Sequence, residues 1–172
     1  KSYQARKLYK NLKKNKIPAL LTREPGGTKG AEIIRKIILK DYFYKSPKEK
    51  FDKYTDTLLY LAARNEHVRN KIKPAIIKKK IILCDRFTDS TIAYQVYGKG
   101  VKQELVNYIH SFILNGIMPK LTFVLKVNLS TALKRLKKRK KKNRYDKFSR
   151  GFYNKAQNAF IRIAKKNKKR YI

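Results

Sequence analysis

The sequence predicts an α/β protein with three layers, α/β/α, and a central parallel sheet. Short apolar runs at 17–23, 78–86 and 120–127 have the length and composition of buried strands. Segments with helical spacing separate these runs, which favours parallel strands joined by right-handed crossovers. A chain of 172 residues is long enough for one core, so we expect residues 1–172 to form a single domain.

The first half of the chain alternates between helical and extended patterns. Residues 3–15 carry apolar side chains at helical spacing between basic residues, which predicts an amphipathic helix. The strand at 17–23 follows, and "EPGGT" after it predicts a sharp loop. A second helix is expected to begin at about Lys29, with "GAEIIRKIIL". Residues 41–53 are polar, aromatic and interrupted by Pro47, so we expect an exposed connection there.

The second half repeats this alternation. A longer helix is expected over 54–73, and Pro74 falls near its end, where it can kink the helix. The run 78–86 is apolar on both faces, as a central parallel strand should be. The later expected elements are a helix at 103–116 stopped by Gly116, the strand 120–127, a helix at 130–142 capped by Ser130, a final helix at 151–169, and the first step of another strand at 170–172.

The chain is strongly basic, with 46 Lys and Arg against 11 Asp and Glu and a formal charge of +35. Such a charge attracts polyanions, for example RNA, DNA or an acidic membrane surface. Drift toward A/T-rich codons would also enrich Lys, Ile, Asn and Tyr in any protein, so the charge leaves both explanations open. No apolar stretch reaches the roughly 18 residues of a membrane span. The single cysteine, Cys84, cannot form an internal disulfide, which fits a reducing, cytoplasmic location.

Charged residues lie where two of the expected strands end. Arg23 closes the first strand, and Asp85 and Arg86 close the second. Parallel sheets bind ligands at the carboxyl ends of their strands. The sequence therefore predicts a binding crevice at this edge of the sheet.

Five motifs together resemble the bacterial thymidylate kinase family. They are "LTREPGGTKGAEIIRKIIL", "LLYLAARNEHV", "IKPAI", "DRFTDSTIAYQVYGKG" and "MPKLTFVLKV", in this order and spacing. Members are P-loop nucleoside monophosphate kinases that make dTDP from dTMP and ATP for dTTP biosynthesis. The resemblance implies this activity, the P-loop fold, ATP and Mg²⁺ as cofactors, a cytoplasmic homodimer and at most nonspecific contact with nucleic acid.

The resemblance also assigns the first two residues. Family members open with a strand and a Gly-rich loop that ends in Gly-Lys-Ser/Thr, whereas this sequence begins at "KSYQ". We therefore expect that strand and loop, and most of the last strand and helix at the other end, to lie outside the 172 residues. Lys1 is expected at the β- and γ-phosphates of ATP, and Ser2 at both ATP and Mg²⁺. Asp85 is the expected Mg²⁺-linked carboxylate, with a turn cap as its alternative.

The remaining substrate residues are also carried over from the family. Arg23 and Arg86 are expected to reach the dTMP phosphate, because guanidinium groups match phosphate oxygens; surface ion pairs are the alternative. Tyr60, where relatives generally carry Phe, is expected to stack on thymine, with a core tyrosine as its alternative. Arg64 is expected to bond a base oxygen, and Thr91 and Gln95 are expected to bond the base edge. Tyr94 is expected to lie against the sugar 2′ position.

The Lys-rich segment at about 137–152 corresponds to the family's lid, which closes over ATP. Arg144 is the candidate for stabilising charge in the transition state and for binding ATP. Arg139 is also assigned to ATP binding, and Arg139 and Arg150 are weaker candidates for the transition-state role. A solvated basic surface is the alternative for the whole segment.

Several residues depart from the family pattern or have no assigned chemistry. Lys120, Lys126 and Asn143 each replace an Asp of the family, which puts full activity in doubt. Glu24 is expected to stabilise its loop, His67 to pack or form a hydrogen bond, and His110 has no matched role. Two other functions stay open: a degenerate kinase fold that binds polyanions or nucleic acid, and a kinase for another deoxynucleoside monophosphate.

Overall fold

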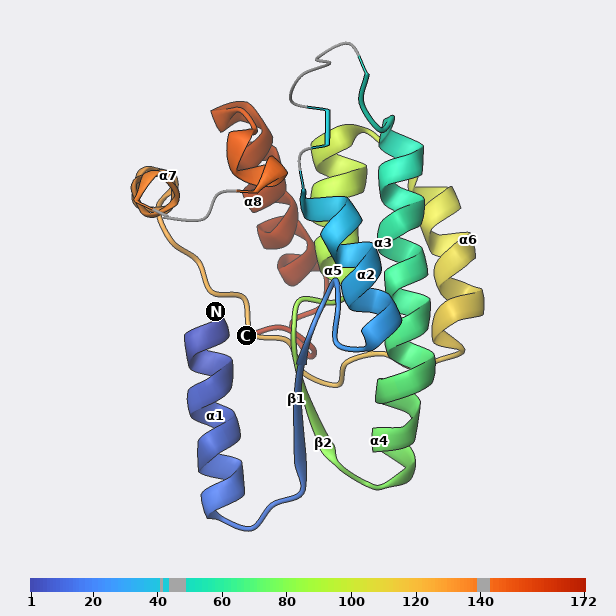
Figure 1. The fold of residues 1–172 in the computed structure, drawn as a ribbon. Helices are drawn as coiled ribbons and strands as arrows, with labels where there is room; N and C mark the ends of the chain where they lie inside the picture. The colour runs from blue at the N-terminus through green and yellow to red at the C-terminus, as the bar shows by residue number, and fades with distance from the viewer. Residues whose placement is uncertain (41, 44–48, 139–142) are drawn as a thin grey trace.

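The computed structural model describes residues 1–40, 42–43, 49–138 and 143–172 (Figure 1). Its sheet consists of β1 (Ala19–Arg23) and β2 (Ile81–Asp85), which pair in parallel. Ala19 lies opposite Ile81, and Arg23 lies opposite Asp85. The expected strands at 17–23 and 78–86 are therefore confirmed, and the register brings their charged ends to one edge.

Helices flank this sheet on both sides, which confirms the α/β fold class. On one side α1 (Ser2–Lys14) packs against both strands, as Figure 1 shows. On the other side lie α2 (Lys29–Leu39) and α3 (Lys53–His67), which pack against each other. The helices at 3–15 and from Lys29 are thus confirmed to within a residue or two.

The long helix expected at 54–73 continues past its predicted end. After α3 the chain makes a π-helical turn, η1 (Val68–Ile72), and enters α4 (Lys73–Ile77). Pro74 lies in the first turn of α4, immediately after this π-helical turn. α4 then packs against β2.

A helix that the sequence analysis did not identify carries the motif after β2. The chain runs through α5 (Thr88–Thr91) directly into the π-helical segment η2 (Ile92–Gly98). The last helix packs along η2. The remaining elements are α6 (Gln103–Leu114), α7 (Leu129–Lys137), the 3₁₀ turn η3 (Arg144–Lys147) and α8 (Arg150–Lys166).

Two expectations about the later chain are wrong. Residues 120–127 form no strand of the β1–β2 sheet. Within the described chain, their only bridge to another backbone segment is a parallel one between Thr122 and Tyr171. This bridge fits the expected first step of a strand at its second residue, Tyr171, whereas Arg170 still belongs to a turn. Ser130 is not a helix cap, because α7 begins one residue earlier and Asn128 takes the N-cap position.

The core lies between the helices and the β2 side of the sheet. One buried cluster comprises Val68, Ile72, Phe87 and Leu114, and partly buried side chains from β2 and α6 pack around it. Because Phe87 belongs to this cluster, the cluster anchors the start of the "DRFTDST" segment in the core. Among the described helices, none combines the length and apolar character needed to cross a membrane.

Candidate active site

At the edge of the sheet, the side chains of the first two residues lie beside a side chain from the middle of the sequence. The Ser2 hydroxyl donates a short hydrogen bond to the Asp85 carboxylate. The Lys1 ammonium nitrogen lies 3.9 Å from Asp85 Oδ1. The structure thus places an ammonium, a hydroxyl and a carboxylate together at the carboxyl end of β2.

Three guanidinium groups occupy the neighbouring space, and the sequence analysis identified only two of them. Arg35, from α2, donates to the carbonyl oxygen of Pro25 at 2.6 Å. Burial lowers the pKa of Arg35, and the positive charges of Arg23 and Arg86 act in the same direction, because like charges near each other disfavour ionisation. Arg23 itself is half-exposed and pairs with Glu32 at 3.1 Å. This group of cations is suited to an anion.

Arg86 is held in an unusual backbone conformation. Its φ is +76°, a left-handed value that non-glycine residues seldom adopt. Its side chain donates to the Tyr94 hydroxyl at 3.3 Å, and its guanidinium carbon lies 5.0 Å from the centre of the Tyr94 ring. Strained conformations of this kind cluster at functional sites, where the surrounding structure holds them in place.

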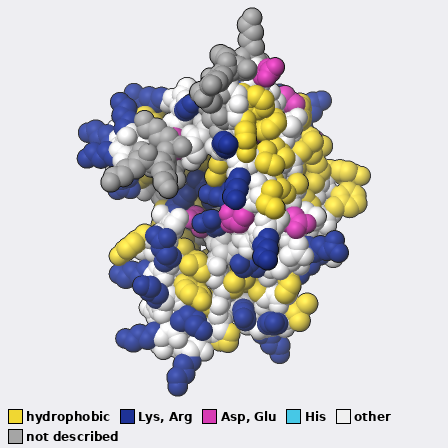
Figure 2. Space-filling view, viewed as in Figure 1, with side chains coloured by type: hydrophobic (Ala, Val, Ile, Leu, Met, Phe, Trp, Pro, Cys, Tyr) yellow, Lys and Arg dark blue, Asp and Glu magenta, His cyan; other side chains and the backbone are white. Residues whose placement is uncertain are grey.

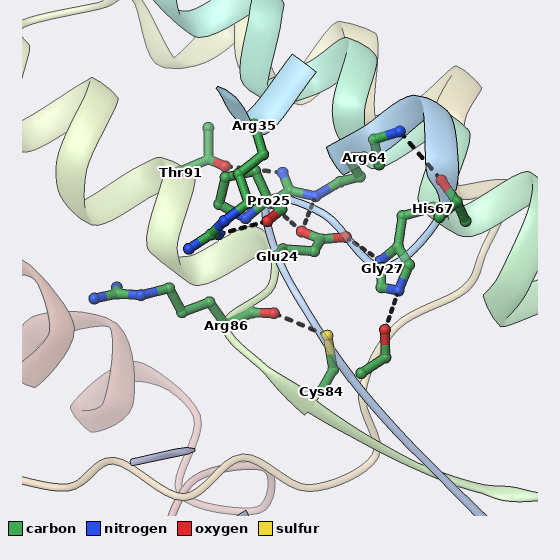
Figure 3. A network of polar contacts seen from close by, with 12 residues as sticks. Glu24, Pro25, Gly27, Arg35, Arg64, His67, Cys84, Arg86 and Thr91 are labelled. Carbon is green, nitrogen blue, oxygen red and sulfur yellow. Dashed lines mark hydrogen bonds and ion pairs between the residues drawn. The ribbon is translucent and has the colours of Figure 1, made fainter. Parts of the chain in front are cut away.

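The "EPGGT" loop is held by a buried carboxylate (Figure 3). Glu24 accepts from Arg64 Nε at 2.8 Å and pairs with Arg64 Nη2 at 2.7 Å. His67 Nδ1 lies 3.0 Å from the other Glu24 oxygen, and His67 Nε2 lies 2.6 Å from Thr22 Oγ1. Burial acts to raise the pKa of Glu24, but the charge of Arg64 and the hydrogen bonds lower it overall. These contacts fit the expectation that Glu24 stabilises the loop.

The Arg64 guanidinium contacts two more buried side chains besides Glu24. Its Nη1 donates to Thr91 Oγ1 at 2.8 Å and lies 2.6 Å from His110 Nε2. Burial lowers the pKa of His110 to about 4, and the positive charge of Arg64 contributes. His110 is therefore neutral at pH 7, and its unprotonated Nε2 accepts from Arg64. The structure thus joins Arg64 and Thr91, which were each expected to contact the base, and adds His110, for which no role was expected.

The residues assigned to the base and sugar meet around a tyrosine of the lid segment. The Tyr145 ring lies 6.0 Å from the Tyr60 ring and 6.3 Å from the Tyr94 ring, both edge to face. Gln95 Nε2 donates to the Tyr145 hydroxyl at 3.0 Å. Burial raises the pKa of Tyr60 to about 12. Tyr60, Tyr94 and Gln95 therefore form one cluster, but Tyr145 and not Arg64 lies at its centre.

Asp56 contacts η3, which lies within the segment expected to be the lid, and was not identified from the sequence. Its carboxylate, which is fully buried, pairs with Lys99 at 2.6 Å and with Arg144, and accepts from the Tyr145 hydroxyl at 2.7 Å. Arg144 thus lies against α3, whereas Arg139 lies outside the described residues. Arg35 lies inside the first of the five motifs but was assigned no role, whereas Asp56 lies outside all five and only the place of Tyr145 in the expected lid could have indicated it.

Comparisons with known proteins agree with this arrangement. The thymidylate kinase family model matches residues 1–172. A thymidylate kinase of Kosmotoga olearia is 34% identical over 172 residues, covering 100% of this chain and 80% of its own length. One from a Geobacillus species is 40% identical over 169 residues, covering 96% and 78%. The crystal structure of thymidylate kinase from Ehrlichia chaffeensis superposes with a TM-score of 0.74 at 32% identity, covering 100% of this chain and 82% of that one. The chain belongs to the thymidylate kinase family.

Proposed function

We propose that the protein transfers the γ-phosphoryl group of ATP to dTMP, giving dTDP. The observation that carries this proposal is the edge of the β1–β2 sheet, where guanidinium groups adjoin a lysine, a serine and an aspartate. Phosphoryl transfer needs little covalent chemistry from a protein, because positioning and charge stabilisation supply most of the catalysis. This set of groups provides both.

In this proposal the phosphate of dTMP is bound by Arg23 and Arg86, and Arg35 adds a third cation. Guanidinium groups present paired N–H donors that match phosphate oxygens. Arg86 is the least free to move, because its backbone is constrained and its side chain bonds Tyr94. Arg23 must exchange its pairing with Glu32 for the phosphate, which costs little because both partners are partly exposed.

The groups at the strand edge suit Mg²⁺ and ATP. Ser2 and Asp85 supply hard oxygen ligands, which Mg²⁺ prefers, and this cation commonly keeps water and phosphate as its other ligands. A cluster of three or more His, Cys, Asp or Glu is absent from the described residues, and such a magnesium site does not require one. The cation would neutralise charge on the ATP phosphates. Lys1, Ser2, Arg139 and Arg144 are the proposed ATP-binding residues, with 137–152 as the lid.

The nucleoside of dTMP is proposed to lie over α3 and η2. Tyr60 would stack on the base, and Arg64, Thr91 and Gln95 would bond its edge. Tyr94 would lie against the sugar. Arg64 is rigidly positioned for such a role, because Glu24, Thr91 and His110 fix its guanidinium.

The proposal is tested by Arg86→Ala, with Arg69→Ala on the exposed face of η1 as the control. We expect kcat/KM for dTMP to fall at least about a hundredfold in Arg86→Ala, because a proposed phosphate ligand is lost. Arg69→Ala should leave turnover unchanged. Equal activity in both variants would contradict the phosphate assignment.

We infer that the working unit is a cytoplasmic homodimer formed through α3 and α6. A groove of about 480 Å³ between these helices is lined by apolar side chains, including Leu58 and Phe112. Figure 2 shows hydrophobic side chains gathered on the side where α2, α3 and α6 lie, whereas Lys and Arg cover much of the remaining visible face. Two copies with a charge of +35 each repel one another unless they meet through uncharged surface. Light scattering should give twice the mass of one chain, and a monomer mass would contradict the inference.

The charge also supports a second candidate, nonspecific binding of a polyanion. Basic side chains cover the visible surface around α1 in Figure 2. Titration of labelled RNA at two salt concentrations separates the functions: tight, steeply salt-dependent binding together with no affinity for nucleotides favours the second candidate. Competition among dTMP, dUMP, dGMP and dCMP tests whether another deoxynucleotide is the substrate.

A further inference from the structure

A directional chain of hydrogen bonds runs from the lid segment to Gln95. The Tyr145 hydroxyl lies 2.7 Å from Asp56 Oδ2 and 3.0 Å from the side-chain amide of Gln95. A hydroxyl has one proton to donate, and an ionised carboxylate can only accept. Tyr145 must therefore give its proton to Asp56, and its oxygen can only accept from Gln95.

Asp56 lies between two cationic side chains, as suits the hydrogen-bond acceptor that this direction requires. Its carboxylate is fully buried, yet two cations contact it, Lys99 at 2.6 Å and Arg144. Opposite charges at such distances favour the ionised form of a carboxyl group. The two cations come from η2's C-cap and from the lid segment, so they hold Asp56 from two sides.

The chain of bonds fixes which end of the Gln95 amide faces Tyr145. The two ends of a glutamine amide are nearly the same in shape, and only its partners decide the orientation. Because the Tyr145 oxygen is an acceptor here, the NH₂ group of Gln95 must face it. The side-chain oxygen of Gln95, Oε1, then faces away from Tyr145, and within the described part of the chain no hydrogen bond reaches it.

We propose that Tyr145, fixed by Asp56, is a specificity-determining positioning residue that makes Gln95 present a hydrogen-bond acceptor to the nucleobase. Thymine and uracil carry an N–H donor at position 3, whereas cytosine has a bare nitrogen lone pair there. An acceptor at Gln95 thus pairs with thymine or uracil and faces the cytosine lone pair with another lone pair. The inference deepens the proposed function and rests on it, because it needs a base seated at Gln95.

Discrimination of this kind is large when it leaves a buried group unpaired. A site that hydrogen-bonds a substrate donor rejects analogues that lack the donor, because its own polar group loses a partner. Without the Tyr145 hydroxyl, Gln95 can rotate its amide and offer NH₂ to cytosine. Tyr145 acts through Gln95, so its loss should change the choice of base more than the rate.

The test compares dUMP with dCMP, two substrates that differ only at the base edge in question. We measure kcat/KM and calorimetric affinity for both in the full chain and in Tyr145→Phe, which keeps the ring. Tyr97→Phe is the matched control: it removes a tyrosine hydroxyl from the same helical segment as Gln95, and its ring packs near Arg162 and outside the proposed site. Asp56→Asn, which can donate as well as accept, provides a second variant.

We expect the unaltered chain to favour dUMP over dCMP, Tyr145→Phe to lower that ratio about tenfold, and Tyr97→Phe to leave it unchanged. Asp56→Asn should lower the ratio in the same direction. Equal losses for both nucleotides in Tyr145→Phe would mean a merely structural role and would overturn the inference, while the proposed function would stand. If the unaltered chain binds neither dTMP nor dUMP, the proposed function itself fails and the inference with it.

Discussion

Replacing Glu24 with Gln would remove the negative charge at the centre of the buried loop network. Glutamine keeps the shape of the side chain and one acceptor oxygen, so little space is created. The charge of Arg64, however, would remain buried with only neutral partners, Thr91 and His110. The substitution therefore isolates the effect of charge from that of packing.

The size of the effect follows from the burial of the pair. The side chains of Arg64 and Glu24 are 2% and 4% exposed, and they meet through Nε at 2.8 Å and Nη2 at 2.7 Å. Breaking a buried pair by removing one partner costs about 3–5 kcal/mol, because the other charge is left without compensation. One acceptor survives in Gln, so we expect the free energy of unfolding to fall by about 3 kcal/mol.

Urea denaturation of Glu24→Gln and Glu32→Gln at pH 7 provides the measurement and its control. Glu32 pairs with Arg23 at 3.1 Å, but their side chains are 38% and 56% exposed, so that ion pair should contribute no more than about 1 kcal/mol. If Glu24→Gln costs no more than Glu32→Gln, burial does not set the strength of this network and the reasoning is refuted.

Two further predictions concern the same loop and its neighbours. Gly27→Ala should cost at least about 2 kcal/mol, because φ is +98° and a Cβ would lie 2.6 Å from His67 Cδ2; Gly100→Ala, at φ +71° with open space around it, should cost clearly less in the same urea experiment. For His110, the folded pKa of about 4 lies below the ordinary 6.5, so the unfolded chain binds the proton first and stability is lost as pH falls from 6.5 to 4. That loss should approach about 3 kcal/mol. His110→Asn should show a correspondingly smaller loss between pH 7 and pH 4, and an unchanged pH profile would contradict it.

The parts of the fold that the sequence predicts well are those governed by local pattern. The runs that became β1 and β2 are apolar and end in charge, and α2 begins at Lys29 because Thr28 caps it by accepting from Ala31 N–H. The run 120–127 has the same local pattern as the strands, yet among the residues that the structure describes its backbone bridges only to Tyr171. Strand formation depends on a partner, and the pattern of one segment cannot supply that information.

The helix of residues 88–98 is the reverse case, a helix whose local sequence lacks a helical pattern. Its sequence, "TDSTIAYQVYG", has no apolar stripe, because the side chains that face inward carry polar groups. Their partners in the structure are Arg64 for Thr91, Arg86 for Tyr94 and Tyr145 for Gln95. A helix that lines a site loses the periodic signal on which helix prediction depends. The resemblance to a family identified these residues as binding residues, although their local pattern did not identify the helix.

The buried polar network explains why the site could be only partly predicted. Glu24 bonds a residue 40 positions away, and Tyr145 bonds one 89 positions away. In each bond, which group donates and which accepts depends on whether the carboxylate is ionised and how deeply it is buried. A sequence motif can name Arg64 and Gln95 as polar groups at the right place. Whether Gln95 offers an acceptor or a donor is decided by Asp56 and Tyr145, and that choice exists only once the lid segment packs against α3.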